Sequence, residues 1–213
     1  MKAFQWKRLC AAFTALMLGV FCSACSQPPE PVTGSELEAL RAEYPYVEGN
    51  PFASVMGVED LKEFQRDERF AGFVEVTLTG EPERISLSLS PAAGLPATTI
   101  INYTIPAHVD SVLYKTDCFA GESDILLCIS GAAEGYDLSP FKKNSKFVME
   151  ISVPHPDTVE ASLESAHSVS SLKSFYLTNQ NVLLSMQDIP GAFEDYTGWN
   201  IDAFRRELKK KLS

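Results

Sequence analysis

The three histidines of the chain, His108, His155 and His167, are the first side chains to consider for catalysis or metal binding. None has a second histidine four residues away and none lies beside a cysteine, so the spacing typical of metal ligands is absent. His155 stands between two prolines in VPHPD, which favours a rigid surface loop. We therefore expect no metal site and no cofactor.

Serines and carboxylates are numerous, but they form no catalytic motif. The chain has no G-x-S-x-G elbow, and no S-x-x-K is followed by the elements that would support it. The acidic groups Glu194-Asp195, and Asp117 with Glu122 and Asp124, lack calcium-loop spacing and fit solvated acidic loops. We expect a non-enzymatic protein. Because a Ser-His-Asp triad can be scattered through a sequence, an extracytoplasmic hydrolase acting on envelope material is the alternative.

The first 24 residues are typical of an export signal. Three basic residues at the start are followed by an apolar run from Ala11 to Phe21, and two small residues precede Cys25. The run is too short to cross a bilayer core, which needs about 20 apolar residues. A retained membrane anchor is the competing interpretation.

The end of this segment, CSAC (22–25), resembles the lipobox of bacterial lipoproteins, in which an apolar residue and two small ones precede a cysteine. The resemblance implies cleavage before Cys25 and attachment of a diacylglyceryl group to its sulfur. Two or three acyl chains together hold a protein stably on a membrane. We expect lipid attachment at Cys25 and a location on the extracellular face of the cell membrane. An ordinary secretory signal with a coincidental cysteine is the alternative.

The residues after Cys25 read as a tether followed by one domain. SQPPEPVTG (26–34) contains three prolines and predicts a stiff, extended spacer. Removal of residues 1–24 takes away three basic and no acidic residues, so the net charge changes from −10 to −13. Such a surface repels phosphate backbones, and nucleic acid is not an expected partner. Residues 35–213 have the length of a single domain.

Cys118 and Cys128 are the cysteines that remain after processing, besides Cys25. An exported protein meets conditions in which disulfides persist, so these two form a possible disulfide. The turn expected around Gly121 does not place them directly opposite each other. Two separate thiols, one of them buried in a strand, are the alternative.

The pattern of apolar residues predicts a mainly β domain with short flanking helices. SELEALRAE (35–43) begins with a capping-box pattern, and Asn200 is a plausible N-cap for a C-terminal helix. Pro106 interrupts a long strand and predicts an edge or a bulge there. We expect helices at 35–43, 58–67 and 201–212, strands at 69–79, 83–90, 98–116, 125–130 and 146–153, and one long strand or a hairpin about 179–181 at 174–188.

The order of these segments resembles the OB-fold domains, similar to tissue inhibitors of metalloproteinases, of exported Gram-positive proteins. Residues 60–76 contain an F-x-G-x-V pattern, 101–116 resemble the long second strand, and 138–152 are similar in layout to the entry into a later strand. The resemblance covers residues 58 to 188. It implies a small OB-like barrel of five or six strands, with short N-terminal helices and a C-terminal helix, and it implies no reaction.

The loop DIPGAFEDYTGWN (188–200) is the candidate binding loop. It carries Phe193, Tyr196 and Trp199 between glycines, and exposed aromatic loops recognise sugars, peptides or partner proteins. The alternative is that the rings dock onto the barrel and seat the terminal helix. We therefore predict a lipid-anchored binding or interaction domain whose partner is a protein, a peptide or a glycan. A lipoprotein that serves only in assembly is a further possibility.

Overall fold

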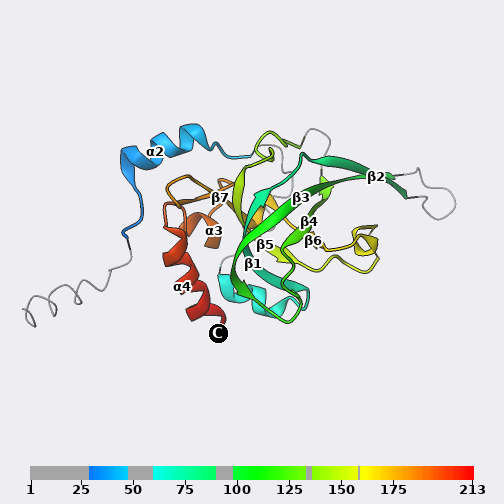
Figure 1. Cartoon of the computed structure of the whole chain (residues 1–213). Coiled ribbons are helices and arrows are strands. Elements are labelled where there is room, and N and C mark those ends of the chain that lie inside the picture. Colours follow the sequence, from blue (N-terminus) through cyan, green and yellow to red (C-terminus); the bar gives the residue numbers. More distant parts are fainter. Residues whose placement is uncertain (1–28, 48–59, 90–97, 133–135, 158) are drawn as a thin grey trace, which may run out of the picture.

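A computed structural model describes residues 29–47, 60–89, 98–132, 136–157 and 159–213. The predicted signal peptide and Cys25 lie outside these residues. Figure 1 shows a β-rich body with helices along one flank. In chain order the elements are α2 (Gly34–Glu43), η1 (Leu61–Arg66), β1 (Phe70–Leu78), β2 (Glu83–Leu89), β3 (Thr98–Lys115), β4 (Asp124–Ala132), β5 (Lys146–Ser152), η2 (Val159–Ser162), β6 (Ala166–Ser168), η3 (Ser171–Lys173), β7 (Ser174–Leu177), β8 (Leu183–Ser185), α3 (Ala192–Asp195) and α4 (Ile201–Leu212).

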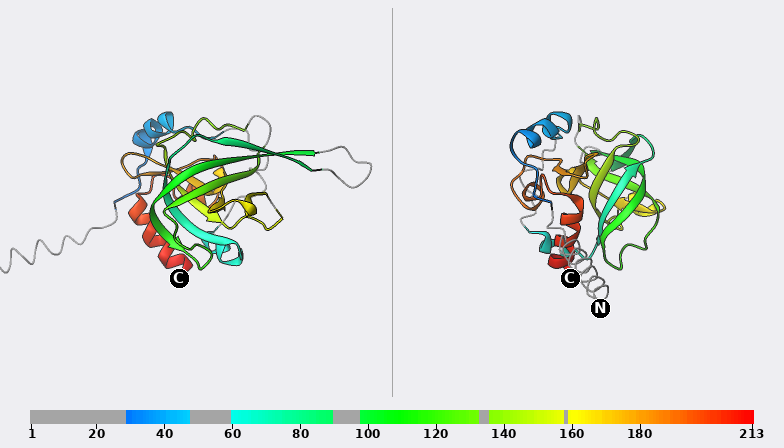
Figure 2. Two further views of the ribbon diagram at one scale, coloured as in Figure 1. Left: turned by 45° about the vertical axis from the view of Figure 1, so that its right-hand side comes forward. Right: turned by 60° about the vertical axis from the view of Figure 1, so that its left-hand side comes forward.

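Five strands close into a mixed β-barrel, which confirms the predicted fold class. β1 is antiparallel to both β3 and β5, and β3 is antiparallel to β4. β4 runs parallel to β6, and β6 meets β5 to complete the ring. β7 adds to β5, β8 adds to β7, and β2 forms a ribbon with β3 that projects from the barrel (Figure 2). The predicted hairpin at 174–188 is therefore present.

β5 and the first half of β1 are buried on both faces because an apolar core lies on each side of them. The barrel interior is filled by aliphatic and aromatic side chains, among them Val74, Val76, Leu78, Ile105, Leu127, Phe147, Met149 and Ile151. A second core packs η1, α3 and α4 against the outside of the barrel, and includes Phe64, Phe73, Phe175, Phe193, Phe204 and Leu208. Each such side chain stabilises the fold by about 1.5–3 kcal/mol relative to an exposed position.

Pro106 lies in β3 at the gap between the pairings of β3 with β2 and with β1. Thr104 pairs with the start of β2 and Ala107 with the end of β1, so no strand residue is paired with Pro106 along that edge. Its carbonyl oxygen accepts a hydrogen bond of 2.9 Å from the Thr79 amide. A Cβ at Gly80 would lie 2.9 Å from the proline ring, so glycine leaves the space that the ring needs. The gap is the local edge that the proline was predicted to require.

The helix predictions hold in position, with corrections to their caps. α2 begins at Gly34, and its N-cap is Thr33 without a side-chain bond, so the capping box predicted at Ser35 is wrong. The predicted helix at 58–67 is a 3₁₀ helix, and the capping box is here, on Asp60 and Glu63. α4 begins as predicted, with the Asn200 side chain accepting from the amide of the second helical residue. Within the described residues, no helix combines the length and the apolar character that crossing a membrane requires.

Candidate functional site

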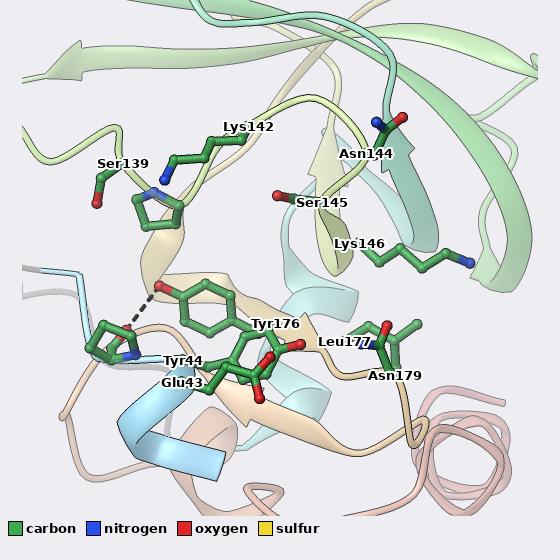
Figure 3. Close-up of a pocket in the computed structure, with 12 residues that line it drawn as sticks. Glu43, Tyr44, Ser139, Lys142, Asn144, Ser145, Lys146, Tyr176, Leu177 and Asn179 are labelled. Carbon is green, nitrogen blue, oxygen red and sulfur yellow. Dashed lines mark hydrogen bonds between the residues drawn. The ribbon is translucent and has the colours of Figure 1, made fainter. Parts of the chain in front are cut away.

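A pocket of about 520 Å³ opens between the C-terminal end of α2, the loop before β5, and β7. Figure 3 shows the loop residues above the opening, and below it Tyr44, which directly follows α2, and Tyr176 of β7. The pocket has the size range of a small-molecule site, but its lining is mostly polar. The lining residues are Glu43, Tyr44, Pro45, Ser139, Pro140, Lys142, Asn144, Ser145, Lys146, Tyr176, Leu177 and Asn179.

One wall of the pocket belongs to residues 32–47, which we call the N-terminal strap. The strap begins where the Val32 amide donates a 2.8 Å hydrogen bond to the Gly198 carbonyl oxygen, and it ends where the Val47 amide donates one of 2.8 Å to the Met186 carbonyl oxygen. Gly198 has a φ of +85°, and a Cβ there would lie 2.3 Å from the Val32 carbonyl oxygen. Val32, near the end of the tether predicted over 26–34, packs against the barrel core.

Arg41 fixes the middle of the strap to the barrel. One guanidinium nitrogen donates a 2.6 Å hydrogen bond to the Ser185 carbonyl oxygen, and another donates to Thr197 Oγ1 at 3.2 Å and to Glu194 Oε2 at 3.5 Å. The guanidinium also lies over the Tyr46 ring, 4.0 Å from its centroid. Burial raises the pKa of Glu194, while the charge of Arg41 lowers it. These contacts hold the next few strap residues at the mouth of the pocket.

Two tyrosines form the lower wall. Tyr176 Oη donates a 2.9 Å hydrogen bond to the Pro45 carbonyl oxygen, and so joins β7 to the strap. The Tyr44 and Tyr176 rings are tilted against each other at 56°, with centroids 5.6 Å apart. Burial raises the pKa of both phenols, so both are protonated and uncharged at neutral pH. The wall thus combines apolar ring surface with hydroxyl groups.

The upper wall is the loop 138–145, whose backbone is already hydrogen-bonded within the protein. The amides of Phe141, Lys142 and Ser145 donate to carbonyl oxygens of the same loop, and the Asn144 amide donates to the Leu78 carbonyl oxygen at 2.8 Å. The Phe141 ring stacks on Phe147 of the barrel interior at 5.4 Å. These four amides are therefore already paired, and the side chains of the loop contribute to the pocket lining.

The pocket carries a positive balance in an acidic protein. Among the residues that the structure describes, Lys142 and Lys146 line it together with a single carboxylate, Glu43, whereas the chain as a whole has a net charge of −10. Both lysine side chains are exposed. Lys146 is 3.8 Å from Asp110, a long ion pair that contributes little at a solvated surface. The geometry suits a polar ligand with negative charge.

The predicted aromatic binding loop is mostly buried. Phe193 and Tyr196 are only 4% and 6% exposed, and Trp199 packs half-buried against the second core. The Tyr196 ring lies 5.0 Å from Phe204 of α4 and 4.9 Å from Trp199. The expectation of an exposed binding loop is wrong, and the rings dock onto the barrel because α4 needs an apolar surface beneath it.

The two cysteines of the domain occupy separate places. Cys118 is exposed in the loop after β3, where its thiol lies 3.4 Å from the Glu68 carbonyl oxygen. Cys128 is buried within β4. Of the two alternatives open from the sequence, the structure has two thiols and not a disulfide, because a strand-bound side chain and a loop side chain do not face each other. The lipid-attachment residue, Cys25, cannot be placed, since it lies outside the described residues.

Two of the histidines meet carboxylates at the surface. His108 Nδ1 lies 3.0 Å from Asp124 Oδ1, and Ser123 Oγ donates to the other oxygen of Asp124 at 3.1 Å. Here the carboxylate stands between serine and histidine, whereas a Ser-His-Asp triad needs the histidine in the middle. The His108 and Asp124 side chains are 47% and 76% exposed. His155 lies 3.6 Å from Asp157 in an exposed loop.

His167 is buried in β6, 5.4 Å from the Phe119 ring and edge-on to it. Neither ring nitrogen has a hydrogen-bond partner, and burial lowers the pKa of the ring, so it is neutral at pH 7. Two of the acidic residues considered in the sequence have partners here: Glu194 pairs with Arg41, and Asp124 pairs with His108. In the part of the chain that the structure describes, no three His, Cys, Asp or Glu side chains are grouped as a metal site.

The pocket residues were not predicted from the sequence. Tyr44 and Tyr176 are far apart in the chain, and no motif connects them. The signal that was present is the stretch SPFKKNSK (139–146), which has three lysines and no acid in a chain with many more acidic than basic residues. This local excess of positive charge is a feature of the loop that the sequence alone displays.

The chain was compared with protein-family models, with curated proteins and with solved structures. No protein-family model matches it, and neither the curated proteins nor the solved structures contain a match.

Proposed function

We propose that this chain is a lipid-anchored protein of the cell envelope, and that its barrel is a non-enzymatic binding module with the pocket as ligand site. The observation that carries the proposal is the construction of the pocket. Its lower wall includes the strap, which follows the predicted anchor directly, and its upper wall is a loop that presents polar side chains. A concave site of this volume, lined by polar side chains and two tyrosine rings, can hold a polar ligand.

The anchor and the strap together place the domain close to a membrane. If Cys25 is the lipidated first residue, residues 26–31 are all that separates it from Val32, the first residue hydrogen-bonded to the domain. An extended, proline-rich segment of this length spans about 19 Å at about 3.1 Å per residue. The strap, which supplies part of the pocket wall, then lies within this distance of the lipid.

We infer further that the barrel is of the OB type that the sequence resembles. In chain order its five strands are β1, β3, β4, β5 and β6, and the first pairs with the second and the fourth while the third and the fifth are parallel. OB barrels commonly hold ligands on the face of the second and third strands. The pocket proposed here lies elsewhere, beside the loop that joins the third strand to the fourth.

A hydrolase is the alternative, and the His108–Asp124 pair is the observation in its favour. The pair lies outside the pocket, and Ser123 contacts the carboxylate instead of the imidazole. An activity assay distinguishes the hydrolase from the binding module. Release of fragments from cell-envelope material, abolished by His108→Ala, would support the hydrolase and contradict the binding module.

The anchor is tested by Cys25→Ala in the producing cell. We expect the variant to leave the membrane fraction, and we expect mass spectrometry of the unaltered protein to find a lipidated amino-terminal Cys25. An intact Met1 with an unmodified thiol at position 25 would refute the anchor.

The pocket is tested by placing a large side chain in it. Asn179 is exposed in the turn between β7 and β8 and lines the pocket, whereas the neighbouring Gln180 is exposed and does not. We expect that ligands found on glycan and peptide arrays bind at least tenfold more weakly to Asn179→Trp than to the unaltered protein. Gln180→Trp is the matched control and is expected to bind normally. Equal binding by both variants would contradict the site.

A further inference from the structure

We propose that the pocket takes an anionic, hydroxyl-rich chain, namely a segment of glycan or polyol that carries carboxylate or phosphate groups. This inference rests on the proposed function, because it names the ligand class of the same pocket. Three features of the pocket lead to it: its charge, the arrangement of its two cations, and the kind of polar groups that line it.

The charge of the pocket is opposite to that of its surroundings. Among the described residues, the lining holds Lys142 and Lys146 with one carboxylate, Glu43, and its amide and hydroxyl side chains are neutral. Asp110, outside the lining, lies 3.8 Å from Lys146 and offsets part of its charge, whereas Lys142 forms no ion pair within the described part of the chain. Charges more than about 8 Å away are largely screened at physiological ionic strength, so these nearby groups set the charge that a ligand meets. A negatively charged group is therefore favoured inside the pocket even though the whole chain is acidic.

The two cations are arranged for an extended ligand. Figure 3 shows the Lys142 and Lys146 side chains pointing away from each other along the upper wall, with Ser145 between them. A single compact ion would be held by cations that converge. Cations that diverge along a cleft suit a chain with negative groups spaced along it.

Both cations are lysines, which act as point charges. Arginine would offer a planar fork that selects bidentate carboxylate or phosphate geometry, and none lines this pocket. The lysine pair accepts either anion, so carboxylate and phosphate are two sources of the same chemistry. They have to be distinguished by experiment.

The other polar groups favour a glycan over a peptide. A peptide is commonly bound through its backbone, which needs unpaired amides or carbonyl groups on the protein. The amides of Lys142, Asn144 and Ser145 are already bonded within the protein. What the pocket offers is side-chain hydroxyl and amide groups and the Tyr44 ring, and these groups pair with ligand hydroxyls and cover sugar rings.

The experiment measures binding of defined probes to the full mature protein in detergent by isothermal titration calorimetry. The probes are oligogalacturonate for carboxylate, a glycerol-phosphate oligomer for phosphate, chitotetraose as a neutral glycan, and tetraglutamate as an acidic peptide. We expect at least one of the first two to bind, and at least tenfold more tightly than either of the others. The tighter of the first two identifies the source of the charge.

Two variants test the lysines. We expect Lys142→Gln with Lys146→Gln to weaken binding about tenfold, roughly threefold for each exposed charge pair. Lys209→Gln with Lys210→Gln removes the same charge from exposed positions on α4, outside the pocket, and is expected to change binding by less than twofold.

Failure of the inference and failure of the proposed function give different results. Binding of chitotetraose or tetraglutamate as tight as that of both anionic probes, no binding of either anionic probe, or no effect of the pocket lysines would overturn the ligand class. If an array ligand is still lost in Asn179→Trp, the pocket remains the site. If that variant binds every array ligand normally, the proposed function itself fails.

Discussion

Replacement of Arg41 by glutamine is the sharpest test of how the pocket is built. Arg41 is the residue that joins the strap to β8 and to the loop that leads into α4, and its side chain is only 15% exposed. Glutamine is shorter and uncharged, so it cannot reach the Ser185 carbonyl oxygen and the Glu194 carboxylate together. We expect the strap, and with it Tyr44, to detach from the barrel more often.

The contacts set the size of the effect. The charged hydrogen bond to the Ser185 carbonyl oxygen is worth about 1.5–3 kcal/mol. The contact with the Tyr46 ring adds about 0.5–1 kcal/mol, and the partly exposed ion pair with Glu194 adds about 0.2–1 kcal/mol. Because these contributions are not additive, we expect the docking of the strap to lose about 2–4 kcal/mol.

Amide hydrogen exchange measures this loss locally. The Val47 amide is bonded to the Met186 carbonyl oxygen only while the strap is docked, so its exchange should accelerate by roughly 30-fold or more for a loss of about 2 kcal/mol. The amide of Val74, inside the barrel sheet, serves as the internal reference and should change far less. Arg206→Gln, at an exposed position on α4, is the matched charge control.

The effect of Arg41→Gln also depends on pH. Burial raises the pKa of Glu194, and loss of the arginine charge raises it further. A carboxyl group with a raised folded-state pKa contributes full stability below its unfolded pKa and loses it as the pH rises through the folded value. The variant should therefore be less destabilised near pH 4 than at pH 7. Unchanged exchange at Val47 together with a pH-independent effect would refute the docking account.

Three further substitutions test the fold. Gly198→Ala forces a Cβ at a φ of +85° to within 2.3 Å of the Val32 carbonyl oxygen, so we expect a loss of about 2 kcal/mol or more in urea unfolding. His167→Met replaces a buried imidazole without hydrogen-bond partners, and should raise the free energy of unfolding by about 1 kcal/mol or more at pH 5. The pKa of His167 is lowered by burial, so its destabilising effect grows as the pH falls below 6.5, and the variant should lose that dependence. Glu150→Gln removes a buried carboxylate whose pKa burial raises, and it should stabilise the protein by about 1 kcal/mol or more at pH 7 and have little effect near pH 4.

Matched controls separate these causes from general disturbance. Gly121 also has a positive φ, +94°, but a Cβ there would lie 3.9 Å from its nearest neighbour, the Lys115 ammonium. Gly121→Ala should therefore lower the free energy of unfolding only by the cost of the backbone conformation, about 1 kcal/mol. Equal losses at Gly198 and Gly121 would contradict the contact with the strap. His155→Gln, at an exposed position, should leave the acid side of the stability curve unchanged. A stability gain from Glu150→Gln that is as large at pH 4 as at pH 7 would contradict a raised pKa of Glu150.

The strands were predictable where one period of the sequence dominates. The period-two alternation in 69–79 and 83–90 predicted β1 and β2, and the apolar residues of 146–153 predicted β5. β5 is apolar at most positions because a core lies on both of its faces. β6 was not predictable. It has only three residues, Ala166–Ser168, and its parallel pairing with β4 comes from closure of the barrel and not from local preference.

The pocket could not be predicted from the sequence either, because it also depends on contacts between residues that are far apart in the chain. Tyr176 meets the Pro45 carbonyl oxygen across 131 positions of the chain, and that contact depends on the docking of the strap. For Phe193 and Tyr196 the sequence suggested a binding site, and the structure has a core instead. Their residue types are those of a binding loop, and they are equally those of a hydrophobic core, so only the position of α4 decides that they are buried.

The central claim is that ligand enters the pocket between the strap and the loop before β5. Nuclear magnetic resonance of the isotopically labelled mature protein, titrated with the array ligand that binds most tightly, tests it most directly. We predict that amide shift changes concentrate in residues 43–46, 139–146 and 176–179. Changes centred instead on the outer face of β3 and β4, or on His108 and Asp124, would contradict the claim.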